Sequence, residues 1–122
     1  MAMAVCAKNE DFQGIGCDVE KEARKIPANS DHHFMNTQDK CSYTALERWC
    51  IKEACFKALS NANIKIKLLK EVLINDDSFG KIDELQLHPS RQFKLIRKNG
   101  YIIVVAFWQK TLTKSEIMEI PE

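Results

Sequence analysis

Two carboxylates near the start of the chain could together bind a metal ion. Asp18 and Glu20 lie two positions apart in the segment Gly14–Glu20, which we expect to be a short strand after a turn. Residues i and i+2 of a strand project from one face, so these carboxylates stand side by side, while Cys17 and Val19 point the other way into a core. Mg²⁺ typically takes one or two protein carboxylates together with phosphates and water. The pair is therefore a candidate magnesium site.

A second group of charges lies in an expected helix that is apolar on nearly every side. Such a helix should be largely enclosed by the protein. Lys52, Glu53 and Lys57 nevertheless occupy its middle, and Glu53 and Lys57 share one face at i, i+4 spacing. Charges in a mostly buried helix are costly unless they are paired or used. This helix is therefore hard to explain as scaffolding alone.

Each group has a simpler explanation when it is taken alone. A Glu–Lys pair at i, i+4 spacing is common on helix surfaces, where it stabilises a helix by about 0.3–0.5 kcal/mol. Two carboxylates on one strand can equally form a solvated strand end. Because both groups occur in one chain, with Trp49 and Lys52 beside the second, we favour a functional interpretation of Asp18, Glu20, Glu53 and Lys57.

Composition limits the kind of protein this can be. The chain has 122 residues, 45% of them hydrophobic and 29% charged, with a net charge of +1. These values are typical of one globular domain and give no indication of a nucleic-acid or membrane partner. There is no apolar run of membrane-spanning length and no secretory signal pattern. An odd count of five cysteines favours reduced thiols, so we expect a cytoplasmic protein.

Hydrophobic patterning predicts an α+β fold with one long helix packed on an antiparallel sheet. Ser42 is the expected N-cap of that helix, and Gly80 is expected in a turn. The Asn99-Gly100 pair predicts a β-hairpin. We expect a domain over residues 1–110 and a polar tail over residues 111–122. The expected strands are 3–8, 13–19, 71–74, 82–87, 91–97 and 101–108, and the expected helix is 43–59.

Two motifs resemble those of the 4'-phosphopantetheinyl transferases. They read GIGCDVE at residues 14–20 and ERWCIKEACFKAL at residues 47–59. Gly-x-Asp-x-Glu followed about thirty residues later by Trp-x-x-Lys-Glu-Ala-x-x-Lys is specific in that order and at that separation. The first motif is more similar to the surfactin-synthetase-activating type than to the short holo-acyl-carrier-protein synthase type. The resemblance runs roughly from Met3 to Lys110 and corresponds to one half of the larger enzymes.

The resemblance implies a substrate and a role for each charged residue. Asp18, Glu20 and Glu53 would hold Mg²⁺ on the pyrophosphate of coenzyme A. Glu53 would also activate the serine hydroxyl of an apo acyl or peptidyl carrier protein. Lys57 would stabilise charge on the phosphate or protonate the departing 3',5'-ADP, and Lys52 would contact phosphate. Asp18, Glu53 and Lys57 are thus the implied catalytic residues, and Lys52 and Lys57 the implied coenzyme contacts.

The chain also departs from the pattern of that family. Members usually carry a Ser-His segment that grips the nucleotide end of coenzyme A, and no Ser-His pair occurs here. This favours an alternative in which a half-domain binds coenzyme A or a carrier protein without turnover, or acts only with a partner. A small nucleic-acid binder, based on lysine clusters alone, is a weaker alternative. One half-domain offers one wall of a cleft, so we expect a homo-oligomer, either a trimer or a dimer.

Overall fold

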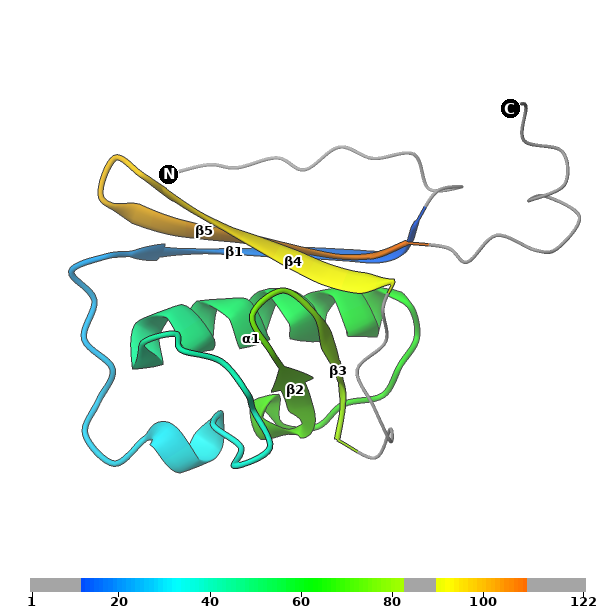
Figure 1. Ribbon diagram of the computed structural model, residues 1–122, viewed down its shortest axis with the longest axis horizontal. Helices are drawn as coiled ribbons and strands as arrows, with labels where there is room; N and C mark the ends of the chain where they lie inside the picture. Colours follow the sequence, from blue (N-terminus) through cyan, green and yellow to red (C-terminus); the bar gives the residue numbers. More distant parts are fainter. Residues whose placement is uncertain (1–11, 83–89, 110–122) are drawn as a thin grey trace, which may run out of the picture.

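A computed structural model of the protein describes residues 12–82 and 90–109. In this part of the chain one long helix lies along one face of an antiparallel sheet, as Figure 1 shows, and the predicted α+β fold is confirmed. The elements, in order, are β1 (Phe12–Lys21), η1 (Asp31–His33), α1 (Ala45–Asn61), η2 (Leu69–Glu71), β2 (Val72–Ile74), β3 (Phe79–Lys81), β4 (Arg91–Lys98) and β5 (Tyr101–Gln109).

The main sheet has the strand order β1-β5-β4, with both neighbouring pairs antiparallel. β4 and β5 form the predicted hairpin, and its turn is made by Asn99 and Gly100, whose φ angles are 53° and 78°. Asparagine and glycine tolerate this left-handed backbone best, which explains why Asn-Gly predicts such a turn. A second, two-stranded sheet of β2 and β3 packs near the same helix.

The core lies between α1 and the face of the main sheet that it covers. Cys50 and Ala58 of the helix and Val104 of β5 are fully buried there. The covered face of β1 carries Gly14, Gly16, Asp18 and Glu20, because these alternate residues face the helix. The prediction that Cys17 and Val19 enter this core is wrong: both are half-buried residues on the opposite face of the sheet.

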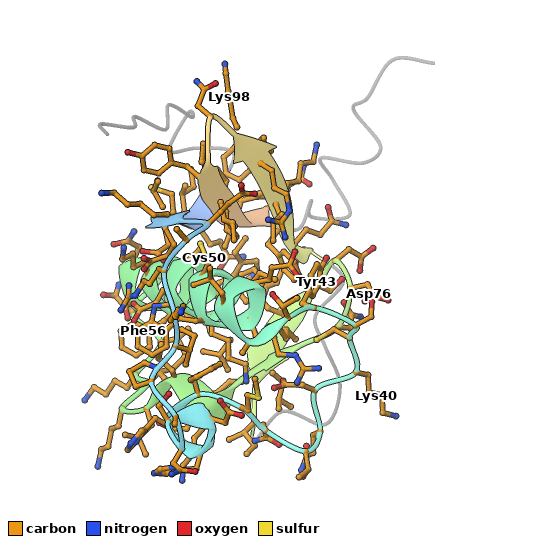
Figure 2. All side chains as sticks on the ribbon, turned by 90° about the vertical axis from the view of Figure 1, so that its left-hand side faces the viewer. Lys40, Tyr43, Cys50, Phe56, Asp76 and Lys98 are labelled. Carbon is orange, nitrogen blue, oxygen red and sulfur yellow. The ribbon has the colours of Figure 1, made fainter. Side chains whose placement is uncertain are left out.

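The helix begins two residues later than predicted. Its N-cap is Thr44 rather than Ser42, and the reason is a capping box with Glu47. The Glu47 amide donates to Thr44 Oγ1 at 3.3 Å, and the Thr44 amide donates to Glu47 Oε1 at 2.8 Å. Just before the helix, the Tyr43 hydroxyl donates to the carbonyl of Asp76, which ties the helix entry to the β2–β3 turn (Figure 2).

Two other sequence predictions need adjustment. Gly80 lies within β3 rather than in a turn, and Ile82 lies in a turn rather than at the start of a strand. The rest of the strand predicted at 82–87, the strand predicted at 3–8 and the tail predicted at 111–122 lie outside the described residues. None of the helices in residues 12–82 and 90–109 combines the length and apolar character that a membrane span requires.

Candidate functional site

The site begins with two glycines that let the helix backbone lie directly on strand β1. A Cβ atom on Gly14 would lie 2.1 Å from the carbonyl oxygen of Ala58, and one on Gly16 would lie 2.2 Å from that of Ala54. Real Cβ atoms essentially never come so close to backbone, so any side chain here would force α1 away from β1. The glycines therefore bring the next residues on this face, Asp18 among them, to the side of the helix.

Lys57 of α1 and Asp18 of β1 meet at this junction. The Lys57 ammonium donates to the carbonyl of Cys17 at 3.0 Å and lies 3.4 Å from Asp18 Oδ1. The Lys57 side chain is 49% exposed and that of Asp18 is 14% exposed. The second oxygen of Asp18, Oδ2, is buried and has no hydrogen-bond partner among the described residues. The junction thus has an accessible cation, Lys57, beside the Asp18 carboxylate, of which only one oxygen has a partner.

The electrostatics of Asp18 reflect this incomplete pairing. Burial, followed by the negative charge of Glu20, raises the pKa of Asp18 to about 6, and Lys57 only partly offsets this rise. A carboxylate of this kind gains from any further cation that approaches it. The i, i+2 spacing of Asp18 and Glu20 on β1 therefore makes ionisation of Asp18 less favourable in the folded protein.

Glu20 is held by two donors at the end of β1. The Trp49 indole N–H lies 3.3 Å from its Oε1, and Arg24 Nη1 lies 2.6 Å from its Oε2. The Arg24 guanidinium also lies over the Trp49 ring, 5.5 Å from the centroid. Sequence reasoning missed Arg24, although its spacing of four residues from Glu20 was an available signal.

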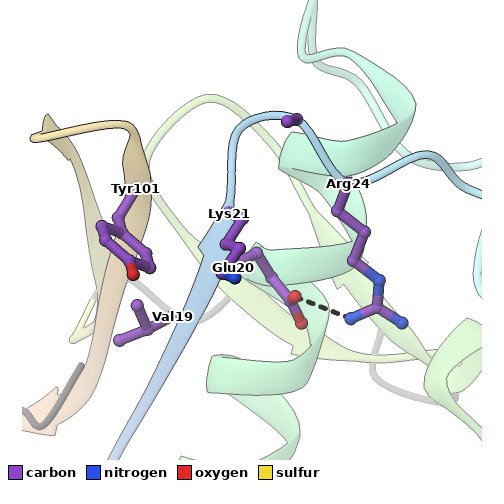
Figure 3. A pocket seen from close by; sticks show the side chains of 6 residues that line it. Val19, Glu20, Lys21, Arg24 and Tyr101 are labelled. Atoms are coloured by element: carbon purple, nitrogen blue, oxygen red, sulfur yellow. Dashed lines mark hydrogen bonds and ion pairs between the residues drawn. The ribbon is translucent and has the colours of Figure 1, made fainter.

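A hollow of about 520 Å³ borders this end of the strand. Figure 3 shows the Glu20–Arg24 ion pair among the side chains that line it, with Tyr101 on the neighbouring strand β5. The hollow is lined by Val19, Glu20, Lys21, Ala23, Arg24 and Tyr101. A ligand in it would therefore lie beside both residues of the ion pair.

Glu53 lies on the helix between Trp49 and Lys57, four residues from each, so all three share one face. Its side chain is half-buried. In the described part of the chain no hydrogen bond or ion pair involves the Glu53 carboxylate. It is therefore available to a substrate or an ion.

Lys52 is the predicted site residue that the structure does not bring to this group. Its side chain is 0% exposed, and its ammonium lies 2.6 Å from Oδ2 of Asp39, whose side chain is also 0% exposed. In this conformation a phosphate in solution cannot reach Lys52. The structure thus gathers Asp18, Glu20 and Lys57 at the β1–α1 junction and places Lys52 inside the protein.

The carboxylates at the junction fit a hard divalent cation in their chemistry. Asp18 and Glu20 supply the one or two carboxylates that Mg²⁺ usually takes from a protein, and the unpartnered Asp18 Oδ2 would gain a ligand. Over residues 12–82 and 90–109, no three His, Cys, Asp or Glu side chains are close enough to form a metal cage. Participation of Glu53 would thus require its side chain to move, and full use of Glu20 would require Arg24 to release it.

Comparison with known families adds an independent finding. Residues 14–106 match the sequence model of a family described as the 4'-phosphopantetheinyl transferase superfamily. The matched range is more than half of the 122 residues and contains both glycines and every charged residue discussed above. A search of curated proteins gave no match.

Proposed function

This chain belongs to the 4'-phosphopantetheinyl transferase superfamily, and from that membership we propose its function. It transfers the phosphopantetheine group of coenzyme A to a serine of an apo acyl or peptidyl carrier protein, with Mg²⁺ as cofactor. The observation that best supports the proposal is the β1–α1 junction. There Lys57 is exposed beside Asp18, Glu20 follows on the same face of β1, and Glu53 has no partner within the described residues. The attack of a nucleophile on a phosphate ester needs these groups: a cation, carboxylates and a free base.

In the proposed reaction the carrier-protein serine oxygen forms a bond to the β-phosphorus of coenzyme A. Glu53 accepts the serine proton, directly or through one water molecule. The bond from that phosphorus to the bridging oxygen breaks, and the electron pair leaves with 3',5'-ADP. Lys57 lies on the same helix face one turn later, where it stabilises or protonates the departing oxygen. Its exposure of 49% leaves the ammonium accessible to the phosphates.

Asp18, Glu20 and Glu53 are the residues that we propose as ligands of Mg²⁺. A bound Mg²⁺ would neutralise charge on the pyrophosphate oxygens. Before it binds, Lys57 partly balances Asp18, and Arg24 together with the Trp49 N–H balances Glu20. These protein contacts hold both carboxylates at the junction.

The test is the mass of an apo carrier protein after incubation with this protein and coenzyme A, with and without Mg²⁺. We expect the mass to increase by one phosphopantetheine group only when all components are present. The panel should include acyl and peptidyl carrier proteins. No increase for any of them at saturating coenzyme A and Mg²⁺ would contradict the transferase proposal.

We also propose that the working form is a homo-oligomer, either a trimer or a dimer. The support is that α1 and β1 provide one wall of the site, with Lys57 about half exposed on it. Coenzyme A carries several phosphates, and a second copy of the chain would supply the facing wall. Light scattering coupled to size exclusion should give a mass two or three times that of the chain. A monomer with full turnover would exclude the shared site.

A further inference from the structure

The ion pair between Lys52 and Asp39 is sealed inside the protein. Both side chains are 0% exposed, and the Lys52 ammonium lies 2.6 Å from Asp39 Oδ2. Burial lowers the pKa of Lys52, and the partner carboxylate opposes that shift. Two charges removed from water carry a desolvation penalty that their attraction repays only with good geometry and further hydrogen bonds. The other contacts of Asp39 therefore indicate what the pair does.

Asp39 connects three parts of the structure. Its Oδ1 accepts a hydrogen bond from the Ile74 amide of β2 at 3.0 Å, and its Oδ2 accepts one from the Asn36 amide at 3.0 Å. The next residue, Lys40, donates its amide to the Ile74 carbonyl at 3.1 Å. Lys52 adds helix α1 as the third part. The ion pair thus fixes the irregular segment 34–40 between the helix and β2.

The same segment supports Trp49 from behind. Phe34, at the start of the segment, is fully buried and meets the Trp49 ring edge to face, with the ring centroids 5.3 Å apart. On its other side Trp49 donates its indole N–H toward Glu20 at 3.3 Å. A continuous series of contacts therefore runs from the buried pair, through Phe34 and Trp49, to a carboxylate of the proposed site.

We propose that Lys52 is a positioning residue and does not contact coenzyme A. With Asp39 it fixes segment 34–40, so that Phe34 holds the Trp49 indole in the orientation that reaches Glu20. The competing role is direct contact of Lys52 with phosphate. That role would require the ammonium to leave Asp39 and would strand a carboxylate in the interior, which is strongly unfavourable. The effect on turnover rests on the proposed function, whereas the effect on Trp49 does not.

The central variants are Lys52→Met and Lys52→Met combined with Asp39→Asn. The single change leaves Asp39 unpaired and should lower the melting temperature by about 10 °C. It should also shift the Trp49 indole N–H resonance and lower kcat by about tenfold, with KM for coenzyme A within about twofold of wild type. The double variant removes the unpaired charge and should recover part of the lost melting temperature, but it does not rebuild the link between α1 and segment 34–40, so the Trp49 resonance and kcat should stay altered. Lys65→Met, at an exposed lysine, is the matched control and should change none of them.

The contrary result is a raised KM for coenzyme A in the double variant. A phosphate contact is lost in both Lys52 variants, so Asp39→Asn cannot restore it. A KM that stays about tenfold above wild type, with the Trp49 resonance at its wild-type position, would overturn the proposal. An unchanged Trp49 resonance in a folded Lys52→Met protein would also overturn it.

Phe34→Leu provides a test that does not disturb the ion pair. It shortens the contact with the Trp49 ring and should shift the Trp49 resonance while Lys52 and Asp39 remain paired. Substitution of Trp108 by Phe leaves Trp49 as the single tryptophan for these spectra. If Phe34→Leu leaves the Trp49 resonance unchanged, the proposed series of contacts is wrong. The spectra can be recorded even if the wild type shows no transfer, so failure of the proposed function and failure of the positioning role are distinguishable.

Discussion

Helix α1 carries two lysines, five residues apart, in very different surroundings. Lys52 is 0% exposed and lies 2.6 Å from Asp39, whereas Lys57 is 49% exposed and lies 3.4 Å from Asp18. Both belong to the motif by which the chain resembles its family. A lysine of this motif can therefore stabilise the fold or be accessible to a substrate, and its surroundings decide which of these it does.

The physical chemistry of the two pairs leads to opposite expectations. A solvent-exposed ion pair is typically worth about 0–1 kcal/mol to stability. Removal of one partner from a buried pair typically costs about 3–5 kcal/mol, because a charge remains in the interior without compensation. Substitution of Lys57 should therefore affect turnover with little effect on stability, whereas substitution of Lys52 should lower the stability directly.

The largest effect should come from Glu53→Gln at the exposed junction. This substitution keeps the shape of the side chain and removes the proposed base, so kcat should fall by about 10²–10⁴-fold. The melting temperature should stay close to wild type, because no ion pair of Glu53 is lost among the described residues. Steady-state kinetics with circular dichroism would measure both. Asp76→Asn, at an exposed carboxylate in the β2–β3 turn, is the control and should leave kcat unchanged. Near-normal turnover by Glu53→Gln would remove Glu53 from the mechanism.

Gly16→Ala should damage stability and turnover together. Its Cβ would lie 2.2 Å from the Ala54 carbonyl oxygen and 2.5 Å from the Ala58 amide nitrogen, so α1 must move away from β1. We expect a stability loss of about 2–4 kcal/mol in urea unfolding and a tenfold or greater loss of kcat/KM, on the order typical of a misplaced site.

Gly100→Ala introduces backbone strain without steric crowding, and so serves as a comparison for Gly16→Ala. Gly100 has φ of +78°, but a Cβ there would meet nothing within 4 Å. Its substitution should cost about 1 kcal/mol and leave turnover unchanged. Equal losses of turnover in the two glycine variants would contradict the role given to the helix–strand contact.

The parts of the fold that depend on local rules were predictable from the sequence. Asn99-Gly100 requires a left-handed turn, and the β4–β5 hairpin forms around it. The helix start was misplaced because Ser42 and Thr44 are both acceptable caps. Only Glu47, three residues after Thr44, completes a capping box and decides between them.

Features that depend on tertiary contacts could not be predicted. Strand alternation shows that Asp18 and Glu20 share a face, but it does not show which face the helix covers, and Cys17 was therefore misplaced. The partner of Lys52 is Asp39, thirteen positions earlier in a segment without regular periodicity, so no spacing rule connects them. The junction residues were found because their types and order suggest chemistry, whereas the buried pair emerged only from the folded structure.

Asp18→Asn should produce a pH-dependent gain in stability of the metal-free protein. The folded-state pKa of Asp18 is raised from 3.8 to about 6, so the folded protein binds this proton more tightly than the unfolded chain does. The Asp18 contribution to stability is therefore present below about pH 4 and is lost as pH rises toward about 6 and above.

The asparagine variant lacks this loss, so its advantage over wild type should grow from pH 4 to pH 7. We expect it to reach about 1–2 kcal/mol, less than the full shift implies because the site borders solvent. Urea unfolding at several pH values would measure the difference between the two proteins. A constant difference across this range would show that the pKa of Asp18 is not raised.

The smallest stability effect should come from Lys57→Met. The exposed ion pair with Asp18 should contribute less than about 1 kcal/mol, so the unfolding midpoint should stay near that of wild type. Lys52→Met, measured in parallel, should lower the midpoint much further. A larger loss from Lys57→Met than from Lys52→Met would reverse the comparison between the two lysines.

The most direct test measures the rate at which an apo carrier protein gains mass, and compares this rate for three forms of the enzyme. They are the wild type, Lys57→Met and the exposed control Lys65→Met. Each is incubated with coenzyme A and Mg²⁺ at equal concentration, and the carrier is followed by mass spectrometry. We predict that the wild type and Lys65→Met add one phosphopantetheine group at equal rates, and that Lys57→Met is slower by about 10²-fold or more while folded normally. Equal rates for Lys57→Met and the wild type would contradict the claim that the exposed charges of the β1–α1 junction carry the transfer.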